Sequence, residues 1–330
     1  MNTANDLKTV SITERRAVFT KVADDIGIRV DMIEKDYWVS WVLNQLFFDP
    51  KTASILLFKG GTSLSKAYNV IYRFSEDIDL LLDLREVSDE NESFEKSRSR
   101  NAINTFKAKI SKNTAAYVND FLRPCIQDRL GKYCNLERGE TPGDLFISYP
   151  AVFASDSYIR PNIKLEIGAV AEGTPFAPQK ISSYVAQKLP QLPEKLSDIP
   201  TVSIERTFWE KISILHYLHF LPEEKPMPLR HSRHFYDVYM LANSQYKQAV
   251  FAGKRLLDTI VSFDSKFYPK RGVDYEVMNL KTLCLTPQSS RIKDLQNDYA
   301  MMQEMIYEPA PSWKELLDFI ACLEEEIRAI

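Results

Sequence analysis

The sequence has little of what marks membrane-spanning, secreted or metal-thiolate proteins. No uninterrupted apolar run approaches the ~20 residues that a transmembrane helix needs, so no membrane partner is expected. The four cysteines form no Cys-x-x-Cys pair, and the polar start of the chain does not resemble a signal peptide. We therefore expect a cytoplasmic protein with reduced thiols.

The chain also lacks the charge excess of a bulk polycation. It has 42 basic and 45 acidic residues in a length of 330, which leaves a net charge of −3. A hydrophobic fraction of 45% fits an ordinary globular protein with a sizeable core. A local basic face remains compatible with nucleic-acid binding, because the field that matters is local. No repeat, low-complexity tract or DNA recognition-helix motif is present.

The N-terminal part alternates between helical and strand patterns. A capping box at Ser11 predicts a helix over residues 12–26, which Gly27 ends. A second cap signal at Asp31 predicts a helix that stops before Pro50. A buried strand over 54–58, a helix over 62–73 and a strand over 77–83 are then expected.

The remaining patterns are mostly helical. Residues 85–125 are charged and helix-prone, and two strands over 145–153 and 158–170 form a predicted hairpin. Five prolines indicate irregular structure over 171–200. Further helices are expected over 204–220, 232–241, 246–263, 292–306 and 313–330. We expect one domain over 1–200, with a helical insertion at about 85–140, and a helical domain over 201–330.

Two aspartates on one predicted strand are the strongest chemical signal. Residues i and i+2 of a strand share a face, so Asp77 and Asp79 project together while Ile78 and Leu80 face the core. Like charges this close favour a cation between them. Mg²⁺, or Mn²⁺ in its place, suits such oxygen ligands together with substrate phosphates. An exposed strand face with unrelated acids is the alternative.

A glycine pair precedes this strand and strengthens the signal. In the segment Lys59, Gly60, Gly61, Thr62 and Ser63, a strand ends, the chain turns and a helix begins. Backbone N–H groups at such a turn hold polyphosphates, and the hydroxyls add donors. A glycine pair alone is more often a tight turn. Together with the acid pair, it predicts a phosphate cradle beside a metal site.

A third carboxylate on a neighbouring strand would complete a two-metal site. Glu166 fits this role, because Ile163, Leu165 and Ile167 face the core and leave Lys164 and Glu166 on the opposite face. A solvated strand face is again the alternative. Glu166 is therefore a candidate metal ligand and catalytic residue.

The segments 58–66 and 73–80 resemble the AbiEii/AbiGii toxin family of nucleotidyltransferases, in the DNA polymerase beta-type superfamily. Residues 33–37 resemble the family's N-terminal helix, and residues 233–237 resemble its distal motif. The similarity is continuous over about 30–85 and patchy over 160–241. It implies an α+β fold, with a polymerase beta-like mixed sheet, flanking helices, a helical insertion and a helical C-terminal domain that completes the active site.

The resemblance also implies a nucleoside triphosphate (NTP) substrate and a divalent metal. It assigns the triphosphate to Gly60, Ser63 and Lys66, and the metal to Asp77 and Asp79. The family's later motifs correspond to Lys211 and Asp237 as further catalytic residues. Lys211 alternatively lies along an apolar face as a snorkelling lysine. Asp237 alternatively forms an i,i+4 ion pair with Arg233, and in the functional interpretation it anchors Lys211 or Arg233 or meets the nucleotide.

Some family members transfer nucleotides to the 3′ end of tRNA and are encoded with an antitoxin. We therefore expect RNA, namely tRNA, as the acceptor and a cognate antitoxin as a partner. The basic residues of 96–112 and the cluster at 230–234 form either an RNA-facing surface or solvated helix faces. Transfer to a small molecule or a protein hydroxyl, and a non-catalytic binding module, are the alternative functions.

Overall fold

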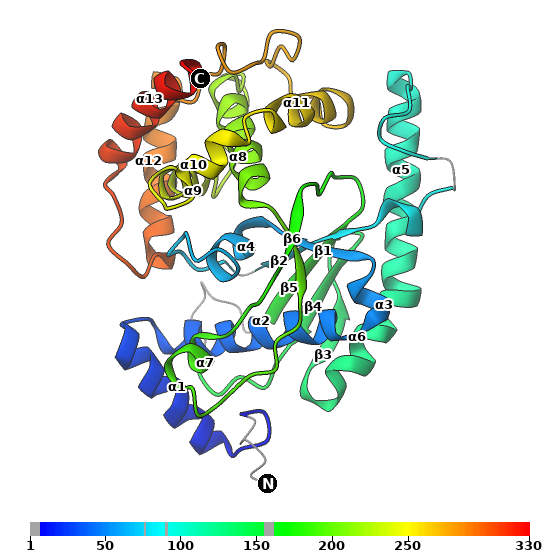
Figure 1. Ribbon diagram of the computed structural model, residues 1–330, viewed down its shortest axis with the longest axis vertical. Helices are drawn as coiled ribbons and strands as arrows, with labels where there is room; N and C mark the ends of the chain where they lie inside the picture. The colour runs from blue at the N-terminus through cyan, green and yellow to red at the C-terminus, as the bar shows by residue number, and fades with distance from the viewer. Residues whose placement is uncertain (1–6, 76, 90–91, 155–161) are drawn as a thin grey trace. The chain divides into compact units, whose positions relative to one another are not determined.

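The computed structural model describes residues 7–75, 77–89, 92–154 and 162–330. The chain divides into two compact units. One, the sheet unit, comprises the residues up to Ala67 with Phe74–Ser93 and Phe106–Val202; the other, the helical unit, comprises Tyr68–Arg73, Phe94–Thr105 and Ser203–Ile330. Together a sheet and many helices make the fold α+β, as predicted (Figure 1).

The sheet has seven strands in the order β3-β4-β5-β2-β1-β7-β6 (Figure 1). Its strands are β1 Leu56–Lys59, β2 Asp77–Leu82, β3 Asn135–Arg138, β4 Asp144–Ser148, β5 Asn162–Gly168, β6 Phe176–Gln179 and β7 Ile199–Val202. The pairs β2/β5 and β1/β7 are parallel and the others are antiparallel. The predicted mixed sheet is therefore confirmed.

Three strands were not predicted from the sequence patterns. Strand β3 lies inside the predicted helical insertion, and β6 and β7 lie in the proline-rich segment expected to be irregular. Pro178 and Pro200 are register partners in the β6/β7 pair. Strand β6 is at the edge of the sheet, where a proline removes no ladder hydrogen bond from a further strand. Prolines therefore did not exclude strands here. The turn of the predicted β4–β5 hairpin falls largely outside the described residues.

The helices of the first half follow the predictions in part. They are α1 Ile12–Ile26, α2 Val30–Phe48, α3 Pro50–Ala53, α4 Gly60–Lys66, α5 Arg100–Tyr117, α6 Arg123–Leu130 and α7 Tyr184–Lys188. Helix α1 has the predicted capping box and a left-handed Gly27. The predicted cap at Asp31 is wrong: α2 begins at Val30, and Asp31 binds the side chain of Arg29.

Helix α4 is shorter than the predicted helix over 62–73. It ends at Lys66, and Asn69 has a left-handed φ of 50°, which cannot continue an α-helix. The following residues, Tyr68–Arg73, belong to the helical unit. The predicted helix was therefore wrong in its second half. The apolar residues there are spaced as in a helix, but they are buried within the helical unit and do not continue α4.

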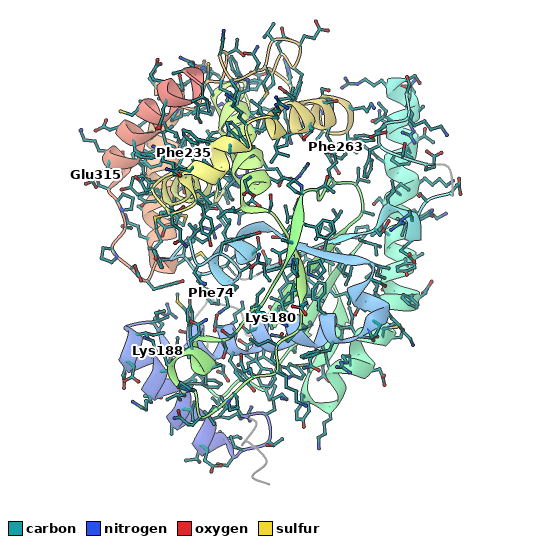
Figure 2. The ribbon with its side chains drawn as sticks, in the orientation of Figure 1. Phe74, Lys180, Lys188, Phe235, Phe263 and Glu315 are labelled. Carbon is teal, nitrogen blue, oxygen red and sulfur yellow. The ribbon has the colours of Figure 1, made fainter. Side chains whose placement is uncertain are left out.

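The helical unit contains α8 Ile204–His219, α9 Ser232–Ala242, α10 Lys247–Ala252, α11 Leu256–Phe267, α12 Ile292–Met302 and α13 Trp313–Arg328. The predicted helix over 246–263 is in fact two helices that separate at Gly253. Phe235 of α9, which Figure 2 labels, packs edge-on against Trp313 of α13, with ring centroids 5.6 Å apart. Within the described part of the chain, no helix has the length and apolarity to cross a bilayer.

The sheet has one buried face and one more open face. Along β2, Ile78, Leu80 and Leu82 are buried, while Asp77 and Asp79 are only half-buried. Strand β5 alternates in the same way. The sequence therefore predicted correctly which side chains of β2 and β5 share the open face.

Candidate active site

A row of charged residues crosses the open face of the sheet. Asp79 of β2 is the register partner of Lys59 on β1 and of Glu166 on β5, and Glu166 is in turn the partner of Asp144 on β4. Asp77 lies in the next row, beside Lys164. Because register partners project to the same side, the topology brings these residues of four strands together. Three carboxylates thus follow one another in a single row.

Gly60 places backbone directly against this row. It has a φ of +82°, which strongly favours glycine, and a Cβ built on it would lie 1.8 Å from Oδ2 of Asp79. The carboxylate of Asp79 therefore occupies the space that any other residue at position 60 would need. The glycine pair and the acid pair meet in the folded protein.

Two hydroxyls near the start of α4 fix this turn. Thr62 donates from its hydroxyl to the backbone oxygen of Asp77, which ties the helix to β2. Ser63 donates to the backbone oxygen of Gly60 over 2.8 Å. Both side chains are buried. Thr62 therefore holds the turn against the strand that carries the acid pair, and Ser63 closes the first turn of α4.

Lys66 is engaged away from the turn, in a buried ion pair. Its Nζ is 2.5 Å from Oδ1 of Asp36 on α2 and 4.3 Å from the ring centroid of Tyr184. The other oxygen of Asp36 accepts from the backbone N–H of Tyr184 over 2.8 Å. Lys66 therefore joins α4 to α2 and α7, and its assignment to the triphosphate stays a prediction.

Lys164 balances the outer two carboxylates of the row. Its ammonium forms ion pairs with Glu166 and, over 3.0 Å, with Asp144. Burial would lower the pKa of Lys164, but hydrogen bonds and charge from the two carboxylates raise it above its ordinary value. Lys164 is thus a fixed cation that Glu166 and Asp144 hold beside Asp77.

The predicted metal fits the acid pair better than the full triplet. Among the described residues, no three His, Cys, Asp or Glu side chains are arranged to hold an ion. The carboxylate of Glu166 faces the ammonium of Lys164, whereas Asp77 and Asp79 share one face. Two carboxylates plus substrate phosphates are a sufficient set for Mg²⁺. The role of Glu166 as a third ligand stays a prediction.

The remaining predicted residues, Lys211 and Asp237, form a buried cluster within the helical unit. Both oxygens of Asp237 accept from Arg73, from Nε over 2.7 Å and from Nη2 over 2.9 Å. Oδ2 also accepts from Nζ of Lys211 over 2.6 Å. Asp237 is fully buried, which alone would raise its pKa, but Arg73 and Lys211 together hold that pKa below its ordinary value.

This charge cluster decides some of the alternatives left open for the two residues. Lys211 is only 7% exposed, so it is not a snorkelling surface lysine. Asp237 anchors Lys211, which was one of the alternatives. Its second partner is Arg73, which lies 164 residues earlier in the sequence. Whether either residue contacts the nucleotide stays a prediction.

Sequence reasoning missed three residues of these clusters. Arg73 and Asp36 each lie inside a segment that resembles the family, yet neither was assigned a role. Asp144 was missed because the predicted strand began one residue later, at Leu145. Arg73 and Asp36 could have been found, because each is an ionisable residue that lies among apolar residues in a segment resembling the family.

A comparison with protein families decides the identity of the chain. Residues 41–319 match the model of the family described as nucleotidyl transferase AbiEii toxin, type IV toxin–antitoxin (TA) system. The chain belongs to this family. It is accordingly a nucleotidyltransferase of the AbiEii toxin type, which confirms the resemblance seen in the sequence.

Curated proteins and solved structures add little to this AbiEii assignment. No curated protein matches the chain. MenT4, nucleotidyltransferase toxin Rv2826c from Mycobacterium tuberculosis H37Rv, is 15% identical, with a TM-score of 0.44 over 94% of this chain and 98% of that one. JHP933 from Helicobacter pylori is 14% identical, with a TM-score of 0.32 over 88% and 93%. Similarity at these scores is too low to support an inference about function.

Proposed function

We propose that this AbiEii-family protein transfers a nucleotide from an NTP to RNA, namely to the 3′ end of tRNA, and acts as the toxin of its TA system. A cognate antitoxin would be its protein partner. Family membership supports the toxin and transferase parts of this proposal. The tRNA acceptor follows from what the family resemblance implies.

The observation that carries the proposal is the contact between Gly60 and Asp79. A polyphosphate and a divalent ion must be held side by side for nucleotidyl transfer. Here a bare glycine backbone with left-handed φ lies against the carboxylate of Asp79, at the end of the strand that also carries Asp77. Such close approach of the backbone to the acid pair suits a triphosphate that binds both the backbone N–H groups and the metal held by the acids.

In this proposal the chain's own residues bind and position the triphosphate. Backbone N–H groups at Gly60 and Gly61 face the phosphates, and Lys59, the register partner of Asp79, adds a positive charge beside them. Thr62 and Ser63 keep the turn in place through their hydrogen bonds to Asp77 and Gly60. Lys66 supports α4 from behind, through Asp36.

Asp77 and Asp79 would hold Mg²⁺ or Mn²⁺, with Glu166 as a further ligand if it leaves Lys164. The ion would supply charge neutralisation for the triphosphate. The acceptor hydroxyl oxygen forms a bond to the α-phosphorus, the bond to the bridging oxygen breaks, and pyrophosphate leaves as the hydroxyl loses its proton. The protein's contribution is positioning and charge stabilisation.

The decisive experiment incubates the purified protein with each α-labelled NTP and Mg²⁺, in separate reactions with purified tRNA, total RNA and total protein. We expect label on tRNA and release of pyrophosphate. Removal of the terminal 3′ hydroxyl of the tRNA by periodate oxidation should prevent labelling. Label on protein but not on RNA would contradict the proposed acceptor, and NTP binding without pyrophosphate release would contradict transfer itself.

A further inference from the structure

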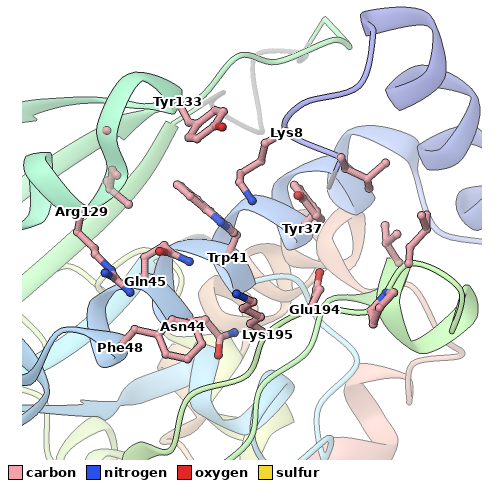
Figure 3. Close-up of a pocket in the computed structure, with 16 residues that line it drawn as sticks. Lys8, Tyr37, Trp41, Asn44, Gln45, Phe48, Arg129, Tyr133, Glu194 and Lys195 are labelled. Atoms are coloured by element: carbon pink, nitrogen blue, oxygen red, sulfur yellow. The ribbon is translucent and has the colours of Figure 1, made fainter. Parts of the chain in front are cut away.

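A pocket within the sheet unit is lined by none of the predicted site residues. It has a volume of about 620 Å³, in the range of small-molecule sites, and is lined by α2, α6 and the segments 131–133 and 185–195 (Figure 3). Neither the acid pair, the glycine turn nor the Arg73–Asp237–Lys211 cluster contributes to its wall. The pocket therefore needs an explanation of its own.

The wall of the pocket is rich in aromatic rings. Trp41 and Tyr133 meet edge to face, with centroids 6.0 Å apart and an interplanar angle of 82°. Tyr37 and Phe48 extend the same surface along α2 (Figure 3). Trp41, Phe48 and Tyr133 are half-buried, and aromatic rings that line a site in this way stack on unpaired bases regardless of which base is present.

Cations surround these rings. Nζ of Lys8 is 5.0 Å from the centroid of Trp41, and the guanidinium carbon of Arg129 is 5.8 Å from that of Phe48. Lys195 also lines the pocket and is exposed. The single carboxylate, Glu194, has both oxygens occupied by the N–H and hydroxyl of Ser183. The pocket is thus locally basic on a chain whose net charge is −3.

A side-chain amide completes the set of groups. Asn44 is saturated, because it bonds to Ser40, Ile181 and Ser197. Gln45, one residue on and half-buried, makes no side-chain hydrogen bond within the described part of the chain. Its amide offers one acceptor and two donors to the edge of a planar ligand.

We propose that this pocket is a second nucleotide-binding site, in which a base stacks on the ring of Trp41 with Tyr133 beside its edge and its phosphate lies toward Arg129 and Lys195. The ligand is either a free nucleotide or an unpaired nucleotide of an RNA strand, since both present the same base and phosphate. The site goes beyond the proposed transfer reaction, which uses the open face of the sheet.

The test is calorimetric titration of the full chain with AMP, GMP, CMP and UMP, and with a short single-stranded oligoribonucleotide. EDTA is present throughout, so that metal-dependent binding at the acid pair does not contribute. Trp41→Leu removes the stacking surface, Arg129→Gln with Lys195→Gln removes the charge, and Lys188→Gln is the matched control. Lys188 is exposed on α7 and does not line the pocket (Figure 2).

We expect Trp41→Leu to weaken binding about tenfold or more, as for the loss of a stacked base. The double charge variant should also weaken nucleotide binding, most strongly at low salt. Lys188→Gln should leave nucleotide binding unchanged. Tighter binding of the oligoribonucleotide than of any mononucleotide would assign the site to an RNA strand, and equal binding would assign it to a free nucleotide.

Three results would overturn the proposal. They are no binding of either ligand, binding that both pocket variants retain, and binding of tripolyphosphate as tight as that of the nucleotides. Because Arg129 and Lys195 are exposed, their variants should fold even if Trp41→Leu does not. Transfer activity is scored separately, so failure here leaves the proposed reaction standing.

Discussion

The two clusters of predicted site residues hold their carboxylates in opposite ways. In the sheet unit, Asp77 and Asp79 are half-buried on an open face, beside a glycine backbone. In the helical unit, Asp237 is fully buried and its oxygens accept from Arg73 and Lys211. The open pair lies at the glycine turn where the triphosphate and its metal are proposed to bind, whereas the buried carboxylate is held by the cations of Arg73 and Lys211. The first should therefore govern activity and the second stability.

The largest expected effect is the loss of transfer in Asp79→Asn. The change preserves shape beside Gly60 but removes half of the paired charge, which in such sites is worth several kcal/mol in the transition state. We expect the rate of label transfer to fall by at least about a hundredfold, with little change in melting temperature. Asp83→Asn, just beyond the same strand, is the matched control and should retain transfer. Full activity in Asp79→Asn would refute the role of the pair.

The next effect is on stability, in Asp237→Asn. Removal of this charge leaves Arg73 and Lys211 buried without their partner, which should lower the free energy of unfolding by about 3–5 kcal/mol. Urea denaturation measures it, and Asp258→Asn, an exposed aspartate of α11, should change it by less than about 0.5 kcal/mol.

A triple variant, Arg73→Met with Lys211→Met and Asp237→Leu, separates charge from packing. Because apolar replacement of a whole buried ion cluster is often neutral, it should recover most of the lost stability. If the triple variant also transfers label normally, the cluster has no role in catalysis. The acid pair would then govern activity alone, and the buried cluster stability alone. An unchanged stability of Asp237→Asn alone would show that the buried cluster is not what holds the helical unit together.

Gly60→Ala tests whether backbone and acid pair are coupled. Left-handed φ costs an alanine about 1–2 kcal/mol, and its Cβ would also displace Asp79. Gly27→Ala has the same backbone strain at φ +70° but open space around its Cβ. We expect a loss of stability in both variants, larger in Gly60→Ala because Asp79 must also move, and a loss of transfer in Gly60→Ala alone. Equal activity in the two would separate Gly60 from the site.

Local patterns in the sequence foretold one cluster far better than the other. The period of two along β2 and β5 was enough to place Asp77, Asp79 and Glu166 on one face, because pleating alone decides it. Nothing local indicated that Arg73 binds Asp237, 164 residues away, or that Lys66 binds Asp36 across 30 residues. Such partners are chosen by the packing of whole elements.

The same reason explains the errors in the fold. The capping boxes at Ser11 and Ser312 depend on neighbours three residues apart, and both are present. Strands β6 and β7 are each four residues long and contain prolines, so only pairing with the rest of the sheet defines them. The end of α4 at Lys66 depends on the boundary between two units, which no periodicity records.

The last effect is one of pH and concerns Asp264, which accepts a hydrogen bond from Ser213 and forms no ion pair within the described part of the chain. Burial raises its pKa to about 6, while Ser213 donates a hydrogen bond to it. A raised pKa means that the folded state binds the proton more tightly, so this contribution to stability is present below about pH 4 and is lost as pH rises through about 6. In Asp264→Asn the loss is absent, and its stability relative to the parent should rise by about 2–3 kcal/mol between pH 4 and pH 7. Urea denaturation across that range measures the difference, with Asp258→Asn as the control. A difference independent of pH would show that Asp264 titrates normally, and that burial without a cation does not suffice to distinguish the two carboxylates.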